Sequence, residues 1–423
     1  MSAPTSTPRT EPFKAPVGTR DVLPPESARW QALIAAFAGQ VGLAGYGLVQ
    51  SPMFEEIGVF ARMGEGTDVV RKEMYDFLDK GERHLALRPE GTASVARAYV
   101  QHRPATPWKV WYAAPSFRYE RPQAGRYRQH HQLGIEALGS QDPDLDAEVI
   151  TLAWDFFRTV GLRDVRLLLN SMGDQADRAA YAEALKSFLT EHLGDLAEAD
   201  RQKVEGHPLR VLDSKRPETI AVLAEAPGPA EHQSDAAREH FARVQQSLGA
   251  AGITYEIEPR LVRGLDYYTH TTFEFQASAL DAAQNAIGGG GRYDGLAEAL
   301  GGAPTPGIGF GIGIERLLLA ATAESTFETP PGLVDVFVVD VVGGAAFSLV
   351  HELRTAGLGA DQTFTGRSMK SQMKQADRSG AAYALIVGED ELQAGTVSIK
   401  SLRSDEPQQT VSRDDLTLSL IHI

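Results

Sequence analysis

The feature that most constrains the fold is a change of pattern at residues 326–332, TFETPPG. Its prolines, glycine and polar residues are typical of a linker. Beyond it, apolar strand-like runs alternate with helical ones, as in LVDVFVVDVV, AAFSLVHELRTAG and AAYALIVGED. This alternation predicts a small α/β domain with helices on a mixed sheet over 333–423. The remainder divides into a larger domain over 17–325 and a flexible lead-in over 1–16, rich in Pro, Ser and Thr.

The larger domain shows one clear helix near its start and a helical stretch in its middle. Residues 25–41 carry apolar side chains at helical spacing and begin at a proline, and GLVQSPMFE at 47–55 follows as a predicted strand. Residues 171–250 are largely helical, whereas short strand-like runs precede and follow them. We therefore expect a helical insertion at about 171–250 within a domain of strands.

Composition excludes several classes of protein. The 423 residues contain no cysteine, which rules out disulfides and thiolate metal sites, and no run of eighteen apolar residues that could span a bilayer. The lead-in has no apolar core of a secretory signal, so we expect a cytoplasmic protein. The formal net charge is −15, so any nucleic acid must be bound through local basic patches.

Phosphate-binding glycine loops are missing, since neither G-x-x-x-x-G-K-[ST] nor a strand followed by G-x-G-x-x-G occurs. If ATP binds, arginines must hold it. The richest arginine segment is FRYERPQAGRYRQHHQ at 117–132, with Arg118, Arg121, Arg126 and Arg128 around a predicted hairpin turn. Guanidinium groups grip phosphate oxygens bidentately, which suits a triphosphate or a nucleic-acid end. The alternative is an ordinary solvated basic hairpin.

Two further segments each allow a functional and a structural interpretation. In LRPEGTAS at 87–94, Glu90 and Thr92 could bind an amino group, or the segment could simply begin a helix. In GIGFGIGIERL at 307–317, glycines alternate with apolar residues before Arg316. Repeated glycines weaken a strand, so they indicate either a close approach to the backbone, such as a planar base, or a tightly packed strand–helix junction.

RGLDYYTHTTFEF at 263–275 places Arg263, Tyr267 and Tyr268 at the entrance of a strand. These side chains could line a pocket for a small polar ring, or form an ordinary strand-end cluster. No metal cluster is predicted: His130 and His131 are adjacent, point to opposite faces of a strand, and have no third ligand nearby in sequence. Any Mg²⁺ would arrive with ATP and be held mainly by its phosphates.

Taken together, these segments resemble the three motifs of class II aminoacyl-tRNA synthetases, in the same order. The helix at 25–41 with its following strand resembles motif 1, SFRYERPQAGRYRQHHQLGIEALG motif 2, and GIGFGIGIERL motif 3. Four further segments are similar in sequence to the histidyl-tRNA synthetase family: GTRDVLPPE near the start, LRPEGTAS, LVRGLDYYTHTTFEF and GGGGRYDGLAEALGG. This resemblance implies an α+β catalytic core on an antiparallel sheet, with a helical insertion and a C-terminal α/β anticodon-binding domain. Only the SLIHI end and the TH after DYY depart from the pattern.

The resemblance also implies a role for each matching residue. Histidine is expected to contact Glu90, Thr92, Gln132, Glu136, Arg263, Tyr267 and Tyr268, ATP to contact Arg118, Glu120, Arg126 and Arg316, and tRNA to contact Arg121 and Gln123. Arg118 would grip the α-phosphate and Arg316 the γ-phosphate, and Arg263 and Arg118 would be catalytic. The implied reaction activates L-histidine with ATP to histidyl-adenylate and transfers it to the 3′ end of tRNA(His), giving AMP and diphosphate.

Two rival functions differ in sequence features. A synthetase-like regulatory subunit of ATP phosphoribosyltransferase usually lacks the anticodon-binding domain and an intact RGLDYY segment, and this chain has both. A structural or RNA-binding protein with a dead site would leave the arginines and glutamates unexplained.

The sequence also predicts two macromolecular contacts, one with a second copy of the chain and one with tRNA. The helix at 25–41 and the strand after it carry more apolar surface than one core would use, which predicts a homodimer. In the C-terminal domain, Arg367, Lys370, Lys374 and Arg378 fall at helical spacing and predict a basic stripe for tRNA phosphates. The alternative is a solvated helix face.

Overall fold

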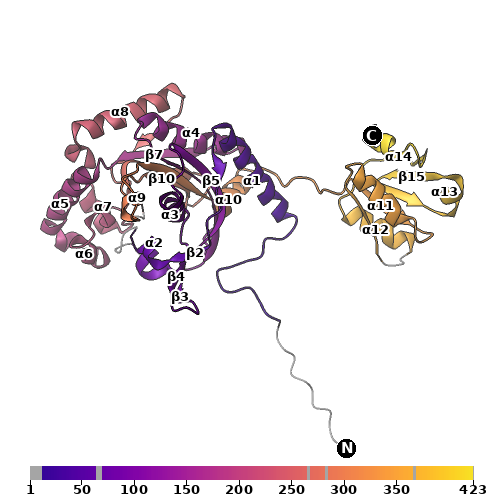
Figure 1. Ribbon diagram of the computed structural model, residues 1–423, viewed down its shortest axis with the longest axis horizontal. Coiled ribbons are helices and arrows are strands. Elements are labelled where there is room, and N and C mark those ends of the chain that lie inside the picture. Colours follow the sequence, from indigo (N-terminus) through magenta and orange to yellow (C-terminus); the bar gives the residue numbers. More distant parts are fainter. Residues whose placement is uncertain (1–11, 63–68, 264–266, 282–283, 365–367, 423) are drawn as a thin grey trace, which may run out of the picture. The chain divides into compact units, whose positions relative to one another are not determined.

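The protein folds into two compact units, Met1–Glu328 and Thr329–Ile423, and the boundary between them in the sequence falls inside the predicted linker (Figure 1). The computed structural model describes residues 12–62, 69–263, 267–281, 284–364 and 368–422. Most of the predicted flexible lead-in, residues 1–11, therefore lies outside the described residues. No helix in the described ranges combines the length and the apolarity needed to cross a membrane.

The first unit is built on a large sheet. In spatial order its strands are β1 (Gly47–Leu48), β5 (Trp108–Phe117), β6 (Gln129–Leu138), β11 (Gly307–Gly313), β10 (Ala286–Arg292), β9 (Thr269–Ala277), β7 (Val165–Ser171) and β8 (Glu256–Ile257). The inner strands from β5 to β7 all pair antiparallel, whereas β1 and β8 add parallel edges. The predicted antiparallel α+β core is thus confirmed.

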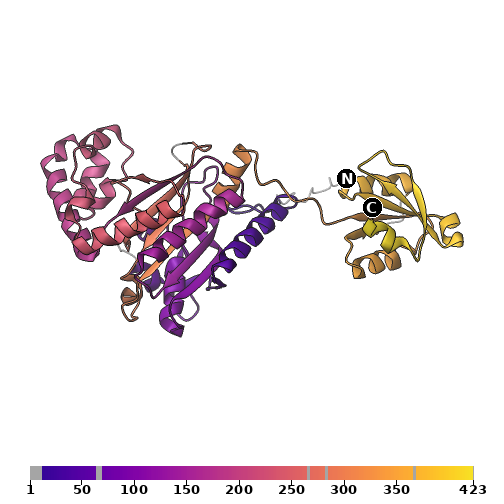
Figure 2. The ribbon, with the colours of Figure 1, turned by 90° about the horizontal axis from the view of Figure 1, so that it is seen from above.

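Three long helices cover one face of this sheet: α1 (Glu26–Leu43), α4 (Pro143–Thr159) and α8 (Asp235–Ala250) (Figure 2). The helix predicted at 25–41 is α1, which buries Trp30, Leu33, Phe37 and Val41. A shorter helix, α10 (Ile314–Ala323), continues directly from β11 and packs into the same core. The opposite face of the sheet is left free of these helices.

The two faces differ because side chains alternate along each strand. In β6, Leu133, Ile135 and Ala137 belong to the helix-covered core, whereas Gln132 and Glu136 alternate with them and lie on the other face. In β11 the apolar residues are again in the core, and the alternating glycines are on the other face. This pattern leaves a polar face on which the glycines give room for the side chains of neighbouring residues, such as Glu136 at Gly309 and Tyr293 at Gly307.

A small sheet with the order β2-β4-β3 lies beside the large one. Its strands are β2 (Phe54–Glu56), β4 (His84–Leu87) and β3 (Asp76–Leu78), and nearby are the helices α2 (Ile57–Ala61), α3 (Thr92–His102) and α9 (Leu296–Ala299) and a π-helical turn, Val69–Glu73. The single strand predicted at 47–55 is therefore wrong: β1 joins the large sheet and β2 the small one. Pro52 lies between the two strands, where no hydrogen bond between strands needs the backbone N–H that proline lacks.

Between β7 and α8 the chain forms a helical insertion with α5 (Gln175–Glu191), α6 (Glu198–Val204) and α7 (Pro217–Leu223), and short 3₁₀ turns at Leu193–Asp195, Pro208–Val211 and Pro229–His232. These segments have a hydrophobic core of their own. The insertion expected at about 171–250 is shorter in the structure, because α8 buries Val244 and Leu248 in the core of the large sheet.

The C-terminal unit is a five-stranded mixed sheet with helices on both faces, as predicted. Its strand order is β13 (Ala360–Gln362), β12 (Val336–Asp340), β14 (Tyr383–Val387), β15 (Thr396–Ser401) and β16 (Gln409–Ser412). Helices α11 (Ala346–Thr355) and α14 (Leu416–His422) pack on one face and α12 (Met369–Arg378) on the other, while α13 (Glu389–Ala394) precedes β15. The end of the chain is a docked helix, because Leu416 and Leu420 are buried in this core.

Candidate active site

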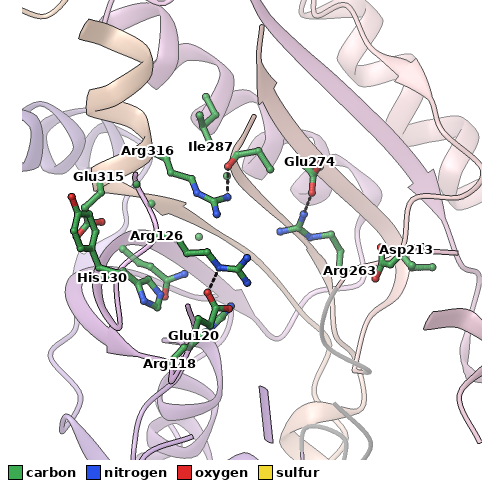
Figure 3. Close-up of a pocket in the computed structure, with 18 residues that line it drawn as sticks. Arg118, Glu120, Arg126, His130, Asp213, Arg263, Glu274, Ile287, Glu315 and Arg316 are labelled. Atoms are coloured by element: carbon green, nitrogen blue, oxygen red, sulfur yellow. Dashed lines mark hydrogen bonds and ion pairs between the residues drawn. The ribbon is translucent and has the colours of Figure 1, made fainter. Parts of the chain in front are cut away.

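A cavity of about 390 Å³ opens on the face of the large sheet that the long helices leave free (Figure 3). Its walls come from β6, β10 and β11, from the hairpin between β5 and β6, and from the start of α10. The predicted residues Arg118, Glu120, Arg126, Gln132, Arg263 and Arg316 all line it. Segments far apart in sequence thus meet around one space.

The glycines of β10 and β11 are required by close contacts with the protein's own side chains. A Cβ on Gly309 would collide with the carboxylate of Glu136, and a Cβ on Gly289 would come within 2.8 Å of the Arg263 guanidinium. Gly311 and Gly313 remain in the cavity wall, and the nearest atom to a Cβ on Gly311 would be Gln132 Nε2 at 3.2 Å. The packing interpretation is confirmed for part of β11, while Gly311 and Gly313 line the cavity, where the close approach of a planar base stays a prediction.

Four arginines border the cavity: Arg118 and Arg126 from the hairpin between β5 and β6, Arg263 from the segment before β9, and Arg316 from α10 (Figure 3). Arg118 follows β5 and donates from Nε to the carbonyl of Pro89 at 2.9 Å. Arg316 lies in the first turn of α10 and donates from Nη1 to the carbonyl of Ala286, also at 2.9 Å. Burial lowers the pKa of Arg316, and the neighbouring charges of Arg126 and Arg118 lower it further. Three guanidinium groups held this close together form a site for a multivalent anion.

Two carboxylates accompany these arginines. Glu120 forms an ion pair with Arg126. Burial alone would favour the neutral acid, but the hydrogen bond and charge of Arg126 give Glu120 a lowered pKa. Glu73, which sequence analysis did not single out, faces the same group, and its burial and the charge of Glu120 raise its pKa to about 7. The two carboxylates therefore differ in their tendency to hold a proton, with Glu73 the one that favours it.

A second group of predicted residues surrounds the carboxylate of Glu136, which is completely buried. Glu136 accepts hydrogen bonds from Thr92 Oγ1 at 2.6 Å, from the Tyr293 hydroxyl at 2.6 Å and from the Tyr112 hydroxyl at 3.4 Å. Burial raises its pKa to about 8 despite these donors. Glu136 is thus a buried carboxylate surrounded by three hydroxyl donors.

Glu90 lies at the start of α3, where it accepts the backbone N–H groups of Thr92 at 2.6 Å and Ala93 at 2.8 Å. The structural interpretation of this segment, a helix start, is therefore confirmed. Burial raises the pKa of Glu90, and the two backbone N–H groups oppose that rise. Because a carboxylate has about four acceptor positions, two remain for a ligand.

Tyr267, Tyr268 and Arg263 come from the segment that precedes β9. The rings of Tyr267 and Tyr268 have centroids 4.7 Å apart, and Tyr267 meets Tyr293 edge to face at 5.8 Å. Arg263 forms an ion pair with Glu274 of β9. Arg263 links this group of aromatic rings to the arginine-lined cavity, because it lines the cavity and its charge opposes the rise in the pKa of Tyr268 that burial causes.

Neighbouring polar residues of β6 are held in defined positions. Gln132 accepts a hydrogen bond from Ser116 Oγ at 3.0 Å and faces the cavity. His130 also faces it, and burial together with the charge of Arg118 lowers its pKa to about 3, so it is neutral. His131 instead contacts Glu315 through Nδ1 at 3.0 Å. Within the described ranges, no three His, Asp or Glu side chains are grouped as metal ligands.

The residues predicted to bind tRNA lie in two units. Arg121 and Gln123 are exposed in the hairpin beside the cavity, and Gln123 accepts a hydrogen bond from Gln284. Lys370 and Lys374 are exposed on α12 of the C-terminal unit. Arg367 lies outside the described residues.

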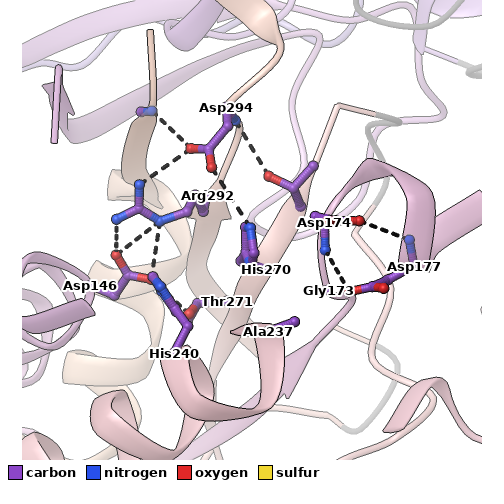
Figure 4. Close-up of polar contacts among 12 residues, drawn as sticks. Asp146, Gly173, Asp174, Asp177, Ala237, His240, His270, Thr271, Arg292 and Asp294 are labelled. Atoms are coloured by element: carbon purple, nitrogen blue, oxygen red, sulfur yellow. Dashed lines mark hydrogen bonds and ion pairs between the residues drawn. The ribbon is translucent and has the colours of Figure 1, made fainter. Parts of the chain in front are cut away.

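A buried ionic network supports the sheet next to the site (Figure 4). Arg292 of β10, fully buried, forms an ion pair with Asp146 of α4, and Asp146 also accepts from His240 of α8 at 2.9 Å and from Thr271 of β9 at 2.7 Å. On its other side Arg292 reaches Asp294 at 3.2 Å. The network ties two strands of the site to two helices on the opposite face.

Several residues of the site were not predicted as site residues. Tyr112 lies in an ordinary strand-like segment, whereas Glu274 and Tyr293 lie in segments that resemble the family; for all three, only the tertiary partners show what they contact. Asp213, from the insertion, also lines the cavity. The alternation of β5 and β9 could have placed Tyr112 and Glu274 on the site face, but not next to particular partners.

Comparison with known proteins agrees with this geometry. A family model described as histidyl-tRNA synthetase matches residues 18–317, and one described as anticodon binding domain matches 335–420. Histidine–tRNA ligase of Rhodococcus erythropolis is 50% identical over 411 residues, which is 96% of each chain. The enzyme of the same name from Synechococcus elongatus is 47% identical over 406 residues, 94% of this chain and 92% of its own.

Solved structures give the same result. The apo histidyl-tRNA synthetase of S. aureus superposes with a TM-score of 0.81 at 35% identity, over 96% of this chain and 99% of its own. The antiparallel sheet, the arginine-lined cavity and the separate C-terminal unit define a class II aminoacyl-tRNA synthetase. Within that class, the chain belongs to the histidyl-tRNA synthetase family.

Proposed function

We propose that the cavity binds ATP and the pocket around Glu136 binds L-histidine, so that histidyl-adenylate forms where the two meet. The enzyme then transfers histidine to the 3′ end of tRNA(His) and releases AMP. The observation that carries this proposal is that the arginine-lined cavity and the buried, hydrogen-bonded Glu136 lie on one face of the sheet, with Arg263 lining the cavity beside Tyr268. A site for an anion next to a site for a polar ring suits a nucleotide and an amino acid that must react with each other.

The arginines have separate tasks in the first step. Attack of the histidine carboxylate on the α-phosphate increases the negative charge there, and Arg118 and Arg263 are placed to stabilise it. Arg126 and Arg316 hold the outer phosphates, which leave as diphosphate. Because each guanidinium is already fixed by a carbonyl or carboxylate, little reorganisation is needed when the charge develops.

The pocket around Glu136 explains selection of histidine. Three donors already contact this carboxylate, which leaves one acceptor position for an imidazole N–H. We assign the other ring nitrogen to Tyr268 and the α-amino group to Glu90 and Thr92, with Gln132 holding the substrate from the cavity side. An apolar side chain in this pocket would leave buried polar groups unpaired, so histidine can be selected without an editing site.

Mg²⁺ enters with ATP in this proposal. Carboxylate oxygens are the ligands it prefers, and the paired Glu73 and Glu120 offer them beside the arginines. Because no three acidic or histidine side chains are grouped in the described part of the chain, the phosphates would supply most of the coordination.

For tRNA, the exposed hairpin residues Arg121 and Gln123 are placed to meet the acceptor end. The basic residues of α12, with Lys370 and Lys374 exposed, would contact phosphates of the anticodon arm. We expect the protein to work in the cytoplasm, where tRNA is charged.

We also propose a homodimer formed through the small sheet and its neighbours. Exposed large apolar residues occur together in these segments, namely Leu43, Leu48, Met53, Phe54, Phe77 and Leu78. Phe54 lies on β2 and Phe77 on β3, the two strands that flank β4, and their rings pack edge to face with centroids 6.4 Å apart. Exposed apolar side chains gathered in neighbouring segments favour a subunit interface here.

The regulatory-subunit alternative is less well supported, because the curated relatives named histidine–tRNA ligase match almost the whole chain, including the C-terminal unit. A dead-site protein would have no reason to hold four arginines around one cavity. A single-turnover reaction with ATP and histidine tests the proposal: histidyl-adenylate should form on the enzyme and disappear when tRNA is added. Formation of no adenylate would overturn it.

A further inference from the structure

The N-terminal segment Gly18–Arg20 lies against the hairpin that carries the ATP-binding arginines. The carbonyl of Gly18 accepts the backbone N–H of Arg128 at 2.7 Å. On its other side, the carbonyl of Arg128 accepts the backbone N–H of Arg118 at 2.8 Å. Backbone hydrogen bonds therefore run from Gly18 through Arg128 to Arg118, the residue assigned to the α-phosphate.

The reason for this contact lies in the sheet. β11 pairs with β6 only as far as Gln132, because the chain turns into α10 after Gly313. Beyond that point β6 still pairs with β5, but its other side has no neighbouring strand among the described residues. Glu315 accepts the backbone N–H of His131 there, and Gly18 accepts that of Arg128. The N-terminal segment thus completes the edge at the base of the hairpin.

Gly18 is required at this position by two independent constraints. Its φ is +84°, a conformation that other residues adopt at a cost. A Cβ there would also lie 2.6 Å from Cγ and 2.7 Å from Cδ of Arg128. The Arg128 side chain runs past Gly18 and places its guanidinium 3.9 Å from the ring centroid of Tyr119 in the same hairpin.

Arg20 holds the next part of the hairpin. Its guanidinium lies 5.4 Å from the Tyr127 ring and 5.9 Å from the Trp30 ring. Two hydrogen bonds to Glu26, at 2.8 and 2.5 Å, fix it to the first turn of α1. Tyr127 lines the ATP cavity beside Arg126, so Arg20 connects the hairpin wall to a helix of the core.

We propose that Gly18–Arg20 is a clamp on the 118–128 hairpin and that Arg20 is a positioning residue for ATP. This inference rests on the proposed assignment of Arg118 and Arg126 to the phosphates. Arg20 does not line the ATP cavity itself; it acts through Tyr127, and Gly18 acts through the backbone of Arg128. Without the clamp the hairpin would fold but hold its arginines less accurately, which costs binding of ATP rather than of histidine.

The test is histidine-dependent exchange of diphosphate into ATP, measured on the full chain with Arg20→Ala. We expect the KM for ATP to rise about 3- to 30-fold, the range for a cation–π contact in a partly desolvated position. The KM for histidine should change less than about 2-fold, the level at which a contact contributes almost nothing. Arg20→Lys, which keeps a cation between Tyr127 and Glu26, should restore most of the ATP affinity.

Arg166→Ala is the matched control, because Arg166 is also paired with a glutamate, Glu256, at the far edge of the same sheet. It should leave both KM values unchanged. An unchanged KM for ATP in Arg20→Ala would overturn the inference, as would equal increases for ATP and histidine, which would mark a general folding contribution.

Arg118→Ala separates this inference from the proposed function. If Arg118→Ala abolishes exchange while Arg20→Ala behaves like the wild type, only the clamp is refuted. If Arg118→Ala retains normal exchange, the phosphate assignment is wrong and the clamp falls with it.

Discussion

At the scale of single residues, the site works by fixing charges before the substrates arrive. Arg263 shows this most clearly, because its guanidinium is paired with Glu274 and packs over the glycine backbone of β10. A charge held in this way is aimed at the reaction centre without further ordering. Glu136 has the complementary property of a buried acid surrounded by donors.

Replacing Arg263 by alanine should reduce adenylate formation by about 10²–10³-fold or more, since a fixed group that stabilises transition-state charge is lost. Single-turnover kinetics with saturating ATP and histidine measure this loss. Arg260→Ala is the control, because Arg260 forms only an exposed ion pair with Glu258 nearby. Near-normal adenylate formation by the Arg263 variant would contradict its assignment.

Replacing Glu136 by glutamine should raise the KM for histidine about 10-fold or more, the size of one charge-assisted hydrogen bond, with little change for ATP. The pH dependence follows from its pKa of about 8. Below that pH the free acid is mostly protonated, so binding an imidazole N–H requires loss of a proton. Histidine affinity should therefore increase as the pH rises through about 8.

Calorimetric titration of histidine at several pH values checks this, and Glu136→Gln should remove the increase. Glu148→Gln, at a carboxylate paired with Lys109 on the far side of the sheet, is the control. Equal effects of Glu136→Gln on histidine and ATP would show that Glu136 only shapes the pocket.

At the scale of elements, the small sheet and α12 present surfaces that one copy of the chain leaves unused. Phe54 and Phe77 are about half exposed, at 51% and 42%, although they pack against each other. α12 buries Gln372 and Ala376 and exposes lysines on its other side. Each surface therefore predicts a partner: a second subunit for the sheet and tRNA for the helix.

Phe77→Glu should convert a dimer into monomers, because a charge would be buried without a partner at the interface. Sedimentation velocity at micromolar concentration measures the change. Phe347→Glu, at a phenylalanine of the C-terminal unit that is 73% exposed, is the control and should stay dimeric. A wild-type chain that is an active monomer at this concentration would refute the dimer itself.

Lys370→Glu combined with Lys374→Glu should weaken tRNA charging and flatten the salt dependence of tRNA binding, since two phosphate contacts account for a slope of about 1.5. Histidine activation without tRNA should stay unchanged. Lys400→Glu, at an exposed lysine of β15, controls for the added charge. Unchanged charging by the double variant would place the anticodon contacts elsewhere.

At the scale of the whole molecule, the local sequence predicts where helices and strands occur better than it predicts which sheet or core each of them joins. The helix at 25–41 and the mixed C-terminal sheet follow from periodicity, and they are confirmed. The strand at 47–55 was wrong because periodicity cannot show that a chain changes sheets at Pro52. Helix α8 looked like part of the insertion because its apolar stripe does not say which core it enters.

The same limit applies to the site. Motif residues such as Arg118 and Arg316 were found because their types and order resemble a known family, and the structure brings them to one cavity. Glu73 has no such signal, and Tyr293 and Arg20 lie in segments that resemble the family without any indication of what they contact, since each matters through a partner distant in sequence. Sequence motifs therefore identify the proposed reacting groups but not the residues that hold them.

The central claim is that the active site joins ATP to histidine and to no other amino acid. Exchange of labelled diphosphate into ATP, measured with each of the standard amino acids in turn, tests it most directly. The account predicts exchange with L-histidine alone, and its loss in Arg263→Ala with an unchanged melting temperature. Exchange with another amino acid, or none with histidine, would contradict it.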